Sequence, residues 1–152
     1  IKYKNRREYL DFYSQALVSR YGKWLSHIQP DALVPVPVHP ARRRKRGFNQ
    51  AEELAERISL LTGIPVRADL LIRIRKTLPQ KELNPAERLN NLRLAFAVSD
   101  FYKAHPEQIP RQVVLADDIY TTGSTIDTVA EELKSRGVQK VCFLTISIGQ
   151  GY

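Results

Sequence analysis

The chain has 152 residues, of which 43% are hydrophobic, which is enough for one domain with a buried core but argues against two independent domains. Its 24 Lys and Arg residues outnumber its 16 Asp and Glu residues, giving a formal charge of +8. This charge favours polyanionic partners such as phosphate-rich metabolites or nucleic acid, although a basic surface on an ordinary soluble protein explains it equally well.

The single cysteine excludes an internal disulfide and a multi-cysteine metal site, and Cys142 is expected in the core of a protein from a reducing compartment. No apolar stretch approaches the roughly 20 residues of a membrane span, and no segment resembles a signal peptide. We therefore expect a cytoplasmic protein without membrane insertion. Because the chain begins at Ile1 and contains no Met, further residues are expected upstream.

The first half of the chain contains two strong helix patterns. Apolar residues every three or four positions predict a helix over residues 7–28, and its Tyr and Trp side chains are interpreted as core packing. A strand is predicted over 32–38, where two prolines favour an edge position or an early end. Asn49 is the predicted cap of a helix over 51–61, which Gly63 should end.

The middle of the chain has weaker patterns. Asn84, followed by Pro and by Glu three positions later, predicts the start of a short helix. The remaining predictions are strands over 70–74 and 94–98, a loop over 75–84 and a connector over 100–110.

The last third predicts a βαβ unit. Residues 113–116 form an apolar strand, a polar loop covers 117–125, one helical face begins at Ile126, and 141–146 is apolar again. Two parallel strands joined by a helix have a right-handed crossover, and ligands of such sheets bind beyond the carboxyl ends of the strands.

The segment from Val113 to Thr125 is the clearest candidate for chemistry. Asp117 and Asp118 follow the predicted strand directly, and two adjacent carboxylates repel each other unless hydroxyl donors or cations compensate. The next residues, Thr-Thr-Gly-Ser-Thr, offer backbone N–H groups and hydroxyls at a helix N-terminus, where anions are favoured. The acids suit the hydroxyls of a ribose and the turn suits a phosphate. The structural alternative is a turn that only caps the helix.

This segment resembles the signature with which type I phosphoribosyltransferases bind 5-phosphoribosyl 1-diphosphate (PRPP). The resemblance implies their α/β fold, with a central, mainly parallel sheet flanked by helices and a flexible loop over the site. It also implies that Asp117 and Asp118 form the catalytic pair that holds the ribose 2′ and 3′ hydroxyls. The 5′-phosphate would be bound by Thr121, Thr122, Gly123, Ser124 and Thr125.

Most of the chain is similar to the ComF family of late competence proteins, which are phosphoribosyltransferase-like and associated with uptake of single-stranded DNA. The most specific mark is the string Arg46-Gly47-Phe48-Asn49-Gln50, and the other matching residues are Val34 to Pro40, Arg75, Thr77, Gln80, Leu83, Arg88, Asn91 and Phe96. Lys2-Tyr3-Lys4 resembles the segment after a cysteine-rich zinc module in longer members. The resemblance thus implies a fragment or short variant: one domain over 1–152 that starts with a helical segment over 1–30.

The family resemblance gives roles to two further segments. The loop that binds the diphosphate would comprise His39, Pro40, Ala41, Arg42 and Arg43. The mobile flap over the site would contribute Arg75, Gln80 and Lys81. A solvated charged face explains much of the basic run over 42–46, and an ordinary surface loop explains the composition of 75–84.

Three functions remain open at this level. The domain could be an active purine- or pyrimidine-type phosphoribosyltransferase of nucleotide salvage, a non-catalytic sensor of PRPP or nucleotides, or a factor that handles single-stranded DNA with the competence machinery. Enzymatic activity is the favoured expectation. Mg²⁺ would bind through PRPP rather than through a protein cage, because a hard cation prefers oxygen ligands.

Overall fold

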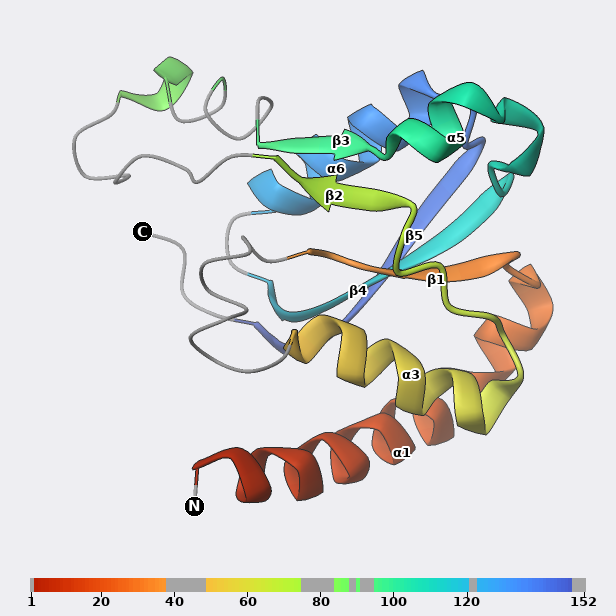
Figure 1. Cartoon of the computed structure of the whole chain (residues 1–152). Helices are drawn as coiled ribbons and strands as arrows, with labels where there is room; N and C mark the ends of the chain where they lie inside the picture. The colour runs from red at the N-terminus through yellow and green to blue at the C-terminus, as the bar shows by residue number, and fades with distance from the viewer. Residues whose placement is uncertain are drawn as a thin grey trace.

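The structure is a computed structural model that describes residues 2–37, 49–74, 84–87, 90, 95–120 and 123–148, with only the backbone for 2–7, 118–120, 124, 147 and 148. Figure 1 shows the arrangement of the elements. In chain order they are α1 (Lys2–Ile28), β1 (Ala32–Pro35), α3 (Gln50–Thr62), β2 (Leu71–Arg73), β3 (Phe96–Val98), α5 (Asp100–Ala104), the 3-10 helix η2 (Pro106–Gln108), β4 (Gln112–Tyr120), α6 (Ser124–Ser135) and β5 (Lys140–Ile148).

A parallel sheet in the order β1-β4-β5 forms the centre of the molecule. The predicted βαβ unit is confirmed as β4–α6–β5, but β4 is longer than predicted: it continues to Tyr120 through Asp117 and Asp118, which were expected in a loop. The physical reason is that β5 also has nine residues and offers ladder partners, pairing Thr145 with Asp117 and Ile148 with Tyr120. A polar composition did not end the strand because its backbone groups remain paired.

Helices cover both faces of the sheet. Figure 1 shows α1 and α3 together on one face, and α6 with the β2–β3 pair on the other. Successive side chains of a strand point to opposite faces of the sheet, so each strand contributes to the helical layers on both sides. Leu33 and Val114 pack in the core on the α1–α3 side, whereas Val34 and Leu115 pack in the core with α6. All four are fully buried, so this sheet positions whatever its edges carry.

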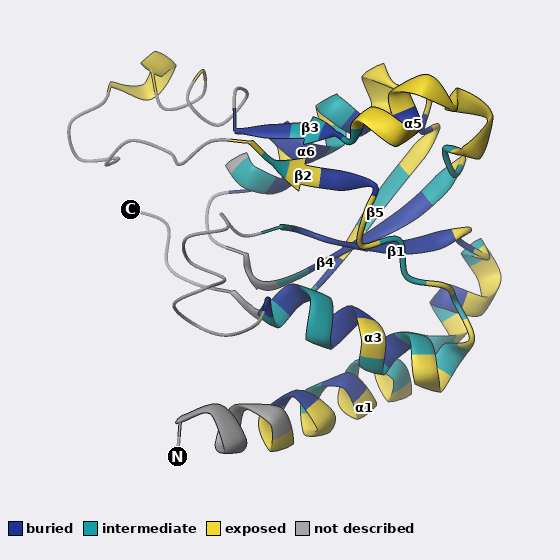
Figure 2. Ribbon diagram, viewed as in Figure 1, coloured by how far each residue is buried: buried dark blue, intermediate teal, exposed yellow. Residues whose placement is uncertain are grey.

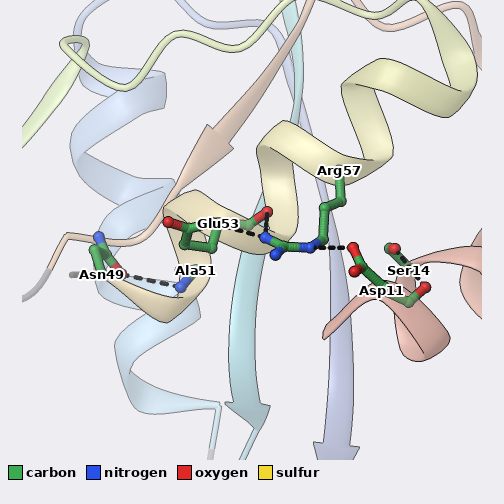
Figure 3. A network of polar contacts seen from close by, with 6 residues as sticks. All are labelled: Asp11, Ser14, Asn49, Ala51, Glu53 and Arg57. Atoms are coloured by element: carbon green, nitrogen blue, oxygen red, sulfur yellow. Dashed lines mark hydrogen bonds and ion pairs between the residues drawn. The ribbon is translucent and has the colours of Figure 1, made fainter. Parts of the chain in front are cut away.

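Helix α3 begins and ends as its sequence predicts. Asn49 caps it through its side chain, and Gly63 ends it in the left-handed region with φ 80°. Arg57 then ties α3 to α1, because it bonds Glu53 of its own helix and Asp11 of α1 (Figure 3). Although partial burial lowers the pKa of Arg57, the hydrogen bonds to Glu53 and Asp11 raise it above the usual value.

Helix α1 starts earlier than predicted, at Lys2, and one of its faces is exposed, as Figure 2 shows. Leu10 and Leu25 are buried. The interpretation of its Tyr and Trp residues as core packing is wrong for Tyr21, which is 37% exposed. Cys142 is half-buried and packs against the α1–α3 core. No helix in the described part of the chain is long and apolar enough to span a membrane.

The small antiparallel pair β2–β3 lies over α6 and is shorter than the two predicted strands. Glu132 of α6 accepts a hydrogen bond from the Val98 N–H group at 3.2 Å. The expected cap at residue 84 is confirmed, since Asn84 Oδ1 accepts from the Glu87 N–H group at 2.8 Å. The predicted connector over 100–110 contains α5 and η2, so it is more regular than its composition suggested.

Candidate functional site

The carboxyl edge of the parallel sheet carries the predicted site residues that the structure describes. Here β1 and β4 end and lead toward the N-termini of α3 and α6. Parallel sheets bind their ligands at this edge, because helix N-termini and strand ends meet there.

Strand β4 brings the acidic pair to this edge. Asp117 is half-buried and opposite Thr145 of β5, and Asp118 is the next residue of the strand. On the other side of β4, the Val36 N–H group donates to the Ala116 carbonyl at 2.9 Å. This bond fixes the end of β1 beside the residue that precedes the acids.

Gly123 lies between β4 and α6 in a conformation that favours glycine. It is buried, with φ 82° and ψ −8°, in a left-handed conformation that costs an L-residue with a side chain about 1–2 kcal/mol. Its carbonyl accepts from the Asp127 N–H group at 2.8 Å, so α6 starts directly after it. Glycine has no side chain with which to cap the first turn. The N–H groups of that turn are suited to binding an anion. Thr125, which lies in the same turn, is half-buried.

The N-terminus of α3 differs from that of α6. Asn49 is 6% exposed, and its Oδ1 accepts from the Ala51 N–H group at 3.0 Å (Figure 3). Its Nδ2 donates to the Val36 carbonyl at 3.3 Å. One side chain thus joins the two ends of the segment over 38–48. The sequence predicted only the cap, although the amide was a usable signal, because Asn has separate accepting and donating atoms, whereas an ionised Asp only accepts and Ser has a single hydroxyl.

Solved structures with the same fold are phosphoribosyltransferases and related enzymes. A purine phosphoribosyltransferase from Pyrococcus horikoshii superposes on 90% of this chain with a TM-score of 0.52. The match covers 73% of the length of that enzyme, at 17% sequence identity. The allosteric regulatory enzyme of purine biosynthesis also superposes on 90% of this chain, with a TM-score of 0.54. That match covers 25% of the length of the enzyme, at 19% sequence identity. The predicted phosphoribosyltransferase fold is confirmed.

No family model matches the chain, but curated relatives do. Competence protein F from Haemophilus influenzae is 34% identical over 112 residues, which are 74% of this chain and 48% of that protein. Competence protein ComFC from Bacillus subtilis is 33% identical over 125 residues, 80% of this chain and 47% of that protein. The chain belongs to the ComF family. DNA utilization protein YhgH from Escherichia coli K12 is 32% identical over 115 residues, 74% of this chain and 47% of that protein.

This ComF chain spans about half the length of the curated relatives it matches. Together with the fold, the relatives make it a phosphoribosyltransferase-like member of this family, and those relatives carry the names of competence and DNA utilization proteins. The roles of the individual site residues are not tested by either comparison and stay predictions.

Several predicted site residues of this ComF chain lie outside the described residues. They are His39, Pro40, Ala41, Arg42 and Arg43 of the diphosphate loop, Arg75, Gln80 and Lys81 of the flap, and Thr121 and Thr122 of the phosphate turn. Asp118 and Ser124 are described by their backbone alone. The structure therefore brings together Asp117, Gly123 and Thr125 at one edge, and the assignment of the loops remains a prediction.

Metal binding by protein side chains alone finds no support in the described part of the chain. No group of three or more His, Cys, Asp or Glu side chains there could hold a metal ion. The carboxylates at the end of β4 are nevertheless the hard oxygen donors that suit Mg²⁺ when a ligand supplies further oxygens.

Proposed function

We propose that this ComF chain binds a phosphoribosyl compound, PRPP or a nucleotide-like relative, at the carboxyl edge of its parallel sheet. The proposal rests on three features that follow one another at this edge. Strand β4 ends with two acids, Gly123 then adopts a left-handed conformation, and α6 starts without a side-chain cap from residue 123. The phosphoribosyltransferase fold supports it, because the solved structures named above share this arrangement of sheet and helices.

Within this proposal the ligand has three parts with separate sites. Asp117 and Asp118 accept hydrogen bonds from the ribose 2′ and 3′ hydroxyls, and Thr121 to Thr125 with Gly123 bind the 5′-phosphate. The loop over 39–43 binds the diphosphate, where Arg42 and Arg43 offset its charge. Arg75, Gln80 and Lys81 of the flap contact the bound ligand. Asp117 and Asp118 would lie beside a Mg²⁺ ion that arrives with the ligand, and the ion would supply positive charge that offsets the charge of the diphosphate.

If the bound compound reacts, diphosphate leaves the anomeric carbon of the ribose as a base or another nucleophile attacks it. The residues named here contribute by positioning the ribose and by stabilising charge, and no covalent protein nucleophile is needed. Asp117 and Asp118 hold the sugar hydroxyls while positive charge develops at the ring. The same site without an acceptor base serves as a sensor of PRPP.

We also propose that the protein acts in uptake or use of DNA, since its relatives are named competence and DNA utilization proteins. Two measurements test the biochemical core of the proposal. Calorimetry with PRPP, with and without Mg²⁺, should give saturable binding that Mg²⁺ strengthens. Diphosphate release measured across the common purine and pyrimidine bases then separates transferase from sensor: release with one base supports the enzyme, and binding without release supports the sensor. Absence of PRPP binding in both buffers contradicts the proposal.

A further inference from the structure

Helix α1 concentrates aromatic and basic residues on the face of the molecule opposite α6. It holds six of the chain's 13 aromatic residues, and it carries six Lys and Arg residues against two Asp and Glu residues. One of the two acids, Asp11, is ion-paired with Arg57 of α3. The helix therefore presents a net positive charge and an unusual density of rings.

Four of these rings form a stripe along α1, defined here as the aromatic stripe: Tyr9, Tyr13, Tyr21 and Trp24. Their spacing of three, four and eight residues, with Leu17 between, places them along one face of the helix. Fifteen residues separate the first ring from the last, which is roughly 22 Å at about 1.5 Å per residue. This length accommodates several stacked bases of an extended strand.

A groove runs beside the aromatic stripe, between α1 and β5. Its volume is about 760 Å³, and Tyr13, Tyr21 and Trp24 line it with Leu144 and Ile146 of β5. Strand β5 is at the edge of the described sheet, so no described strand covers this side. The rings nearest the groove remain accessible, since Tyr21 is 37% exposed and Trp24 is only half-buried. The centroids of these two rings lie 6.5 Å apart in an edge-to-face arrangement.

Cationic groups accompany the rings. Arg20 lines the groove with its guanidinium 5.6 Å from the centroid of the Tyr21 ring. Lys23 is exposed one turn along, and neither cation forms an ion pair with a described carboxylate. A hydrogen bond with Tyr13 raises the pKa of Tyr9, so the Tyr9 phenol adds no negative charge near neutral pH.

We propose that the aromatic stripe and its groove form a binding surface for single-stranded DNA, with bases stacked on the rings and phosphates close to Arg20 and Lys23. Rings interleaved with cations are the chemistry by which proteins bind single strands without sequence preference. Duplex DNA cannot use the rings, because its bases are already stacked on one another. DNA rather than RNA follows from the role in DNA uptake proposed above, while the surface itself is separate from the phosphoribosyl site.

Trp24 provides a direct measurement, because it is the only Trp in the chain. Titration with a 20-nucleotide oligothymidylate should quench its fluorescence saturably, since a stacked base contacts the indole. Inorganic polyphosphate of matched charge should bind without comparable quenching, and duplex DNA should quench far less. Oligouridylate, which has ribose 2′-hydroxyls and lacks the thymine methyl groups, tests RNA as the occupant: binding tighter than that of oligothymidylate would overturn DNA. An unchanged fluorescence spectrum at low salt would overturn the surface.

Variants of Tyr21 separate base stacking from the docking of an apolar protein segment. Tyr21→Leu keeps apolar volume but removes the ring, and it should weaken binding by roughly five-fold or more, the loss typical of one stacked base. Tyr21→Phe should bind as the parent does. Phe101→Leu is a matched control, because Phe101 is a 54% exposed ring on α5, on the other face of the sheet. Equal affinity of Tyr21→Leu and Tyr21→Phe would overturn base stacking.

Charge variants locate the phosphates. Arg20→Gln should reduce the slope of log affinity against log salt by about 0.7, the value for one phosphate contact on a single strand. Neutralising Arg43, Arg44 and Lys45 together tests the competing location in the basic run. If that variant loses DNA affinity while Arg20→Gln and Tyr21→Leu do not, the strand binds at the basic run and the proposed surface is wrong.

PRPP affinity measured in the Tyr21 and Arg20 variants should equal that of the parent, which keeps this test separate from the proposed function.

Discussion

The helices α3 and α6 both start at the same edge of the sheet, but the residues that precede their first turns differ. At α3, the Asn49 side chain bonds the first turn at Ala51 and also the Val36 carbonyl, so its polar groups are used inside the protein. At α6, residue 123 is a left-handed glycine that has no such side chain. The α3 start is therefore closed by a side chain of the fold, whereas residue 123 cannot cap the α6 start, and we expect an anion to bind the N–H groups there.

The opposite edge of the sheet strengthens this contrast. There Asp31 accepts hydrogen bonds from the N–H groups of Arg111 and Gln112, at 3.2 and 3.0 Å, and joins the start of β1 to the start of β4. These contacts join two parts of the protein and lie at its surface. We therefore expect substitutions at the α6 start to act directly on ligand binding and substitutions of Asp31 to act mainly on stability. Substitutions of Asn49 should act through the segment over 38–48 that its side chain joins.

The largest effect is expected from the acids of β4. Asp117→Asn with Asp118→Asn should weaken Mg²⁺-dependent PRPP binding roughly a hundred-fold or more, because two hydrogen bonds to charged groups of about 1.5–3 kcal/mol each are weakened. Calorimetry measures the affinity and circular dichroism checks the fold. Unchanged affinity in a folded double variant would remove ribose recognition from this strand.

Gly123→Ala should produce the next largest effect. The left-handed backbone makes alanine cost about 1–2 kcal/mol of stability, and the added β-carbon should crowd the anion and weaken both PRPP and ribose 5-phosphate binding. We expect roughly a ten-fold loss of affinity, equivalent to about 1.4 kcal/mol.

Gly137→Ala is the matched control for this substitution. Gly137 follows the other end of α6 with φ 112°, and a β-carbon there meets no atom within 4 Å. It should lose similar stability and keep the ligand affinity. If both glycine variants lose affinity equally, strain in α6 rather than crowding of a phosphate is responsible.

A smaller effect is expected at Asn49. Serine is an equally good helix cap but lacks the separate amide NH2 group that donates to Val36, so Asn49→Ser should retain most of the stability and loosen the ends of the segment over 38–48. PRPP affinity should fall several-fold while ribose 5-phosphate affinity stays constant, because only PRPP carries the diphosphate. Asn49→Ala should additionally lose about 1 kcal/mol from the missing cap. Equal losses for the two ligands would detach this segment from the diphosphate.

Local signals predicted the parts of the fold that depend on neighbouring residues. The limits of α3 followed from Asn49 and Gly63, because a cap and a left-handed stop act within one helical turn. The βαβ order of the last third followed from apolar periodicity, and with the resemblance to phosphoribosyltransferases it led to the fold. A glycine at the start of α6 was likewise visible in the run of hydroxyl residues, whereas its left-handed conformation comes from the structure.

Features that depend on distant residues could not be predicted. The length of β4 is set by the ladder with β5, more than 20 positions further along the chain, so the polar residues after Ala116 indicated a loop. The Asn49–Val36 hydrogen bond crosses 13 positions and has no local pattern. The exposure of Tyr21 depends on whether anything covers α1, and helical periodicity identifies a stripe of rings without its neighbours.

The smallest effect on ligand binding is expected at the amino edge of the sheet. Asp31→Ala removes the acceptor of two backbone N–H groups, but the site is exposed, so water can replace part of what is lost. We expect a loss of about 1 kcal/mol in the free energy of unfolding and a fall of roughly 2–4 °C in Tm. PRPP affinity should stay within about two-fold of the parent, since one 1.4 kcal/mol change is needed for a ten-fold effect. A ten-fold loss of PRPP affinity in a folded Asp31→Ala protein would show that the two edges are coupled through β1 and β4. The separation between a structural edge and a ligand-binding edge would then be wrong, and the contrast between the α3 and α6 starts would have to be explained by the position of β4 instead.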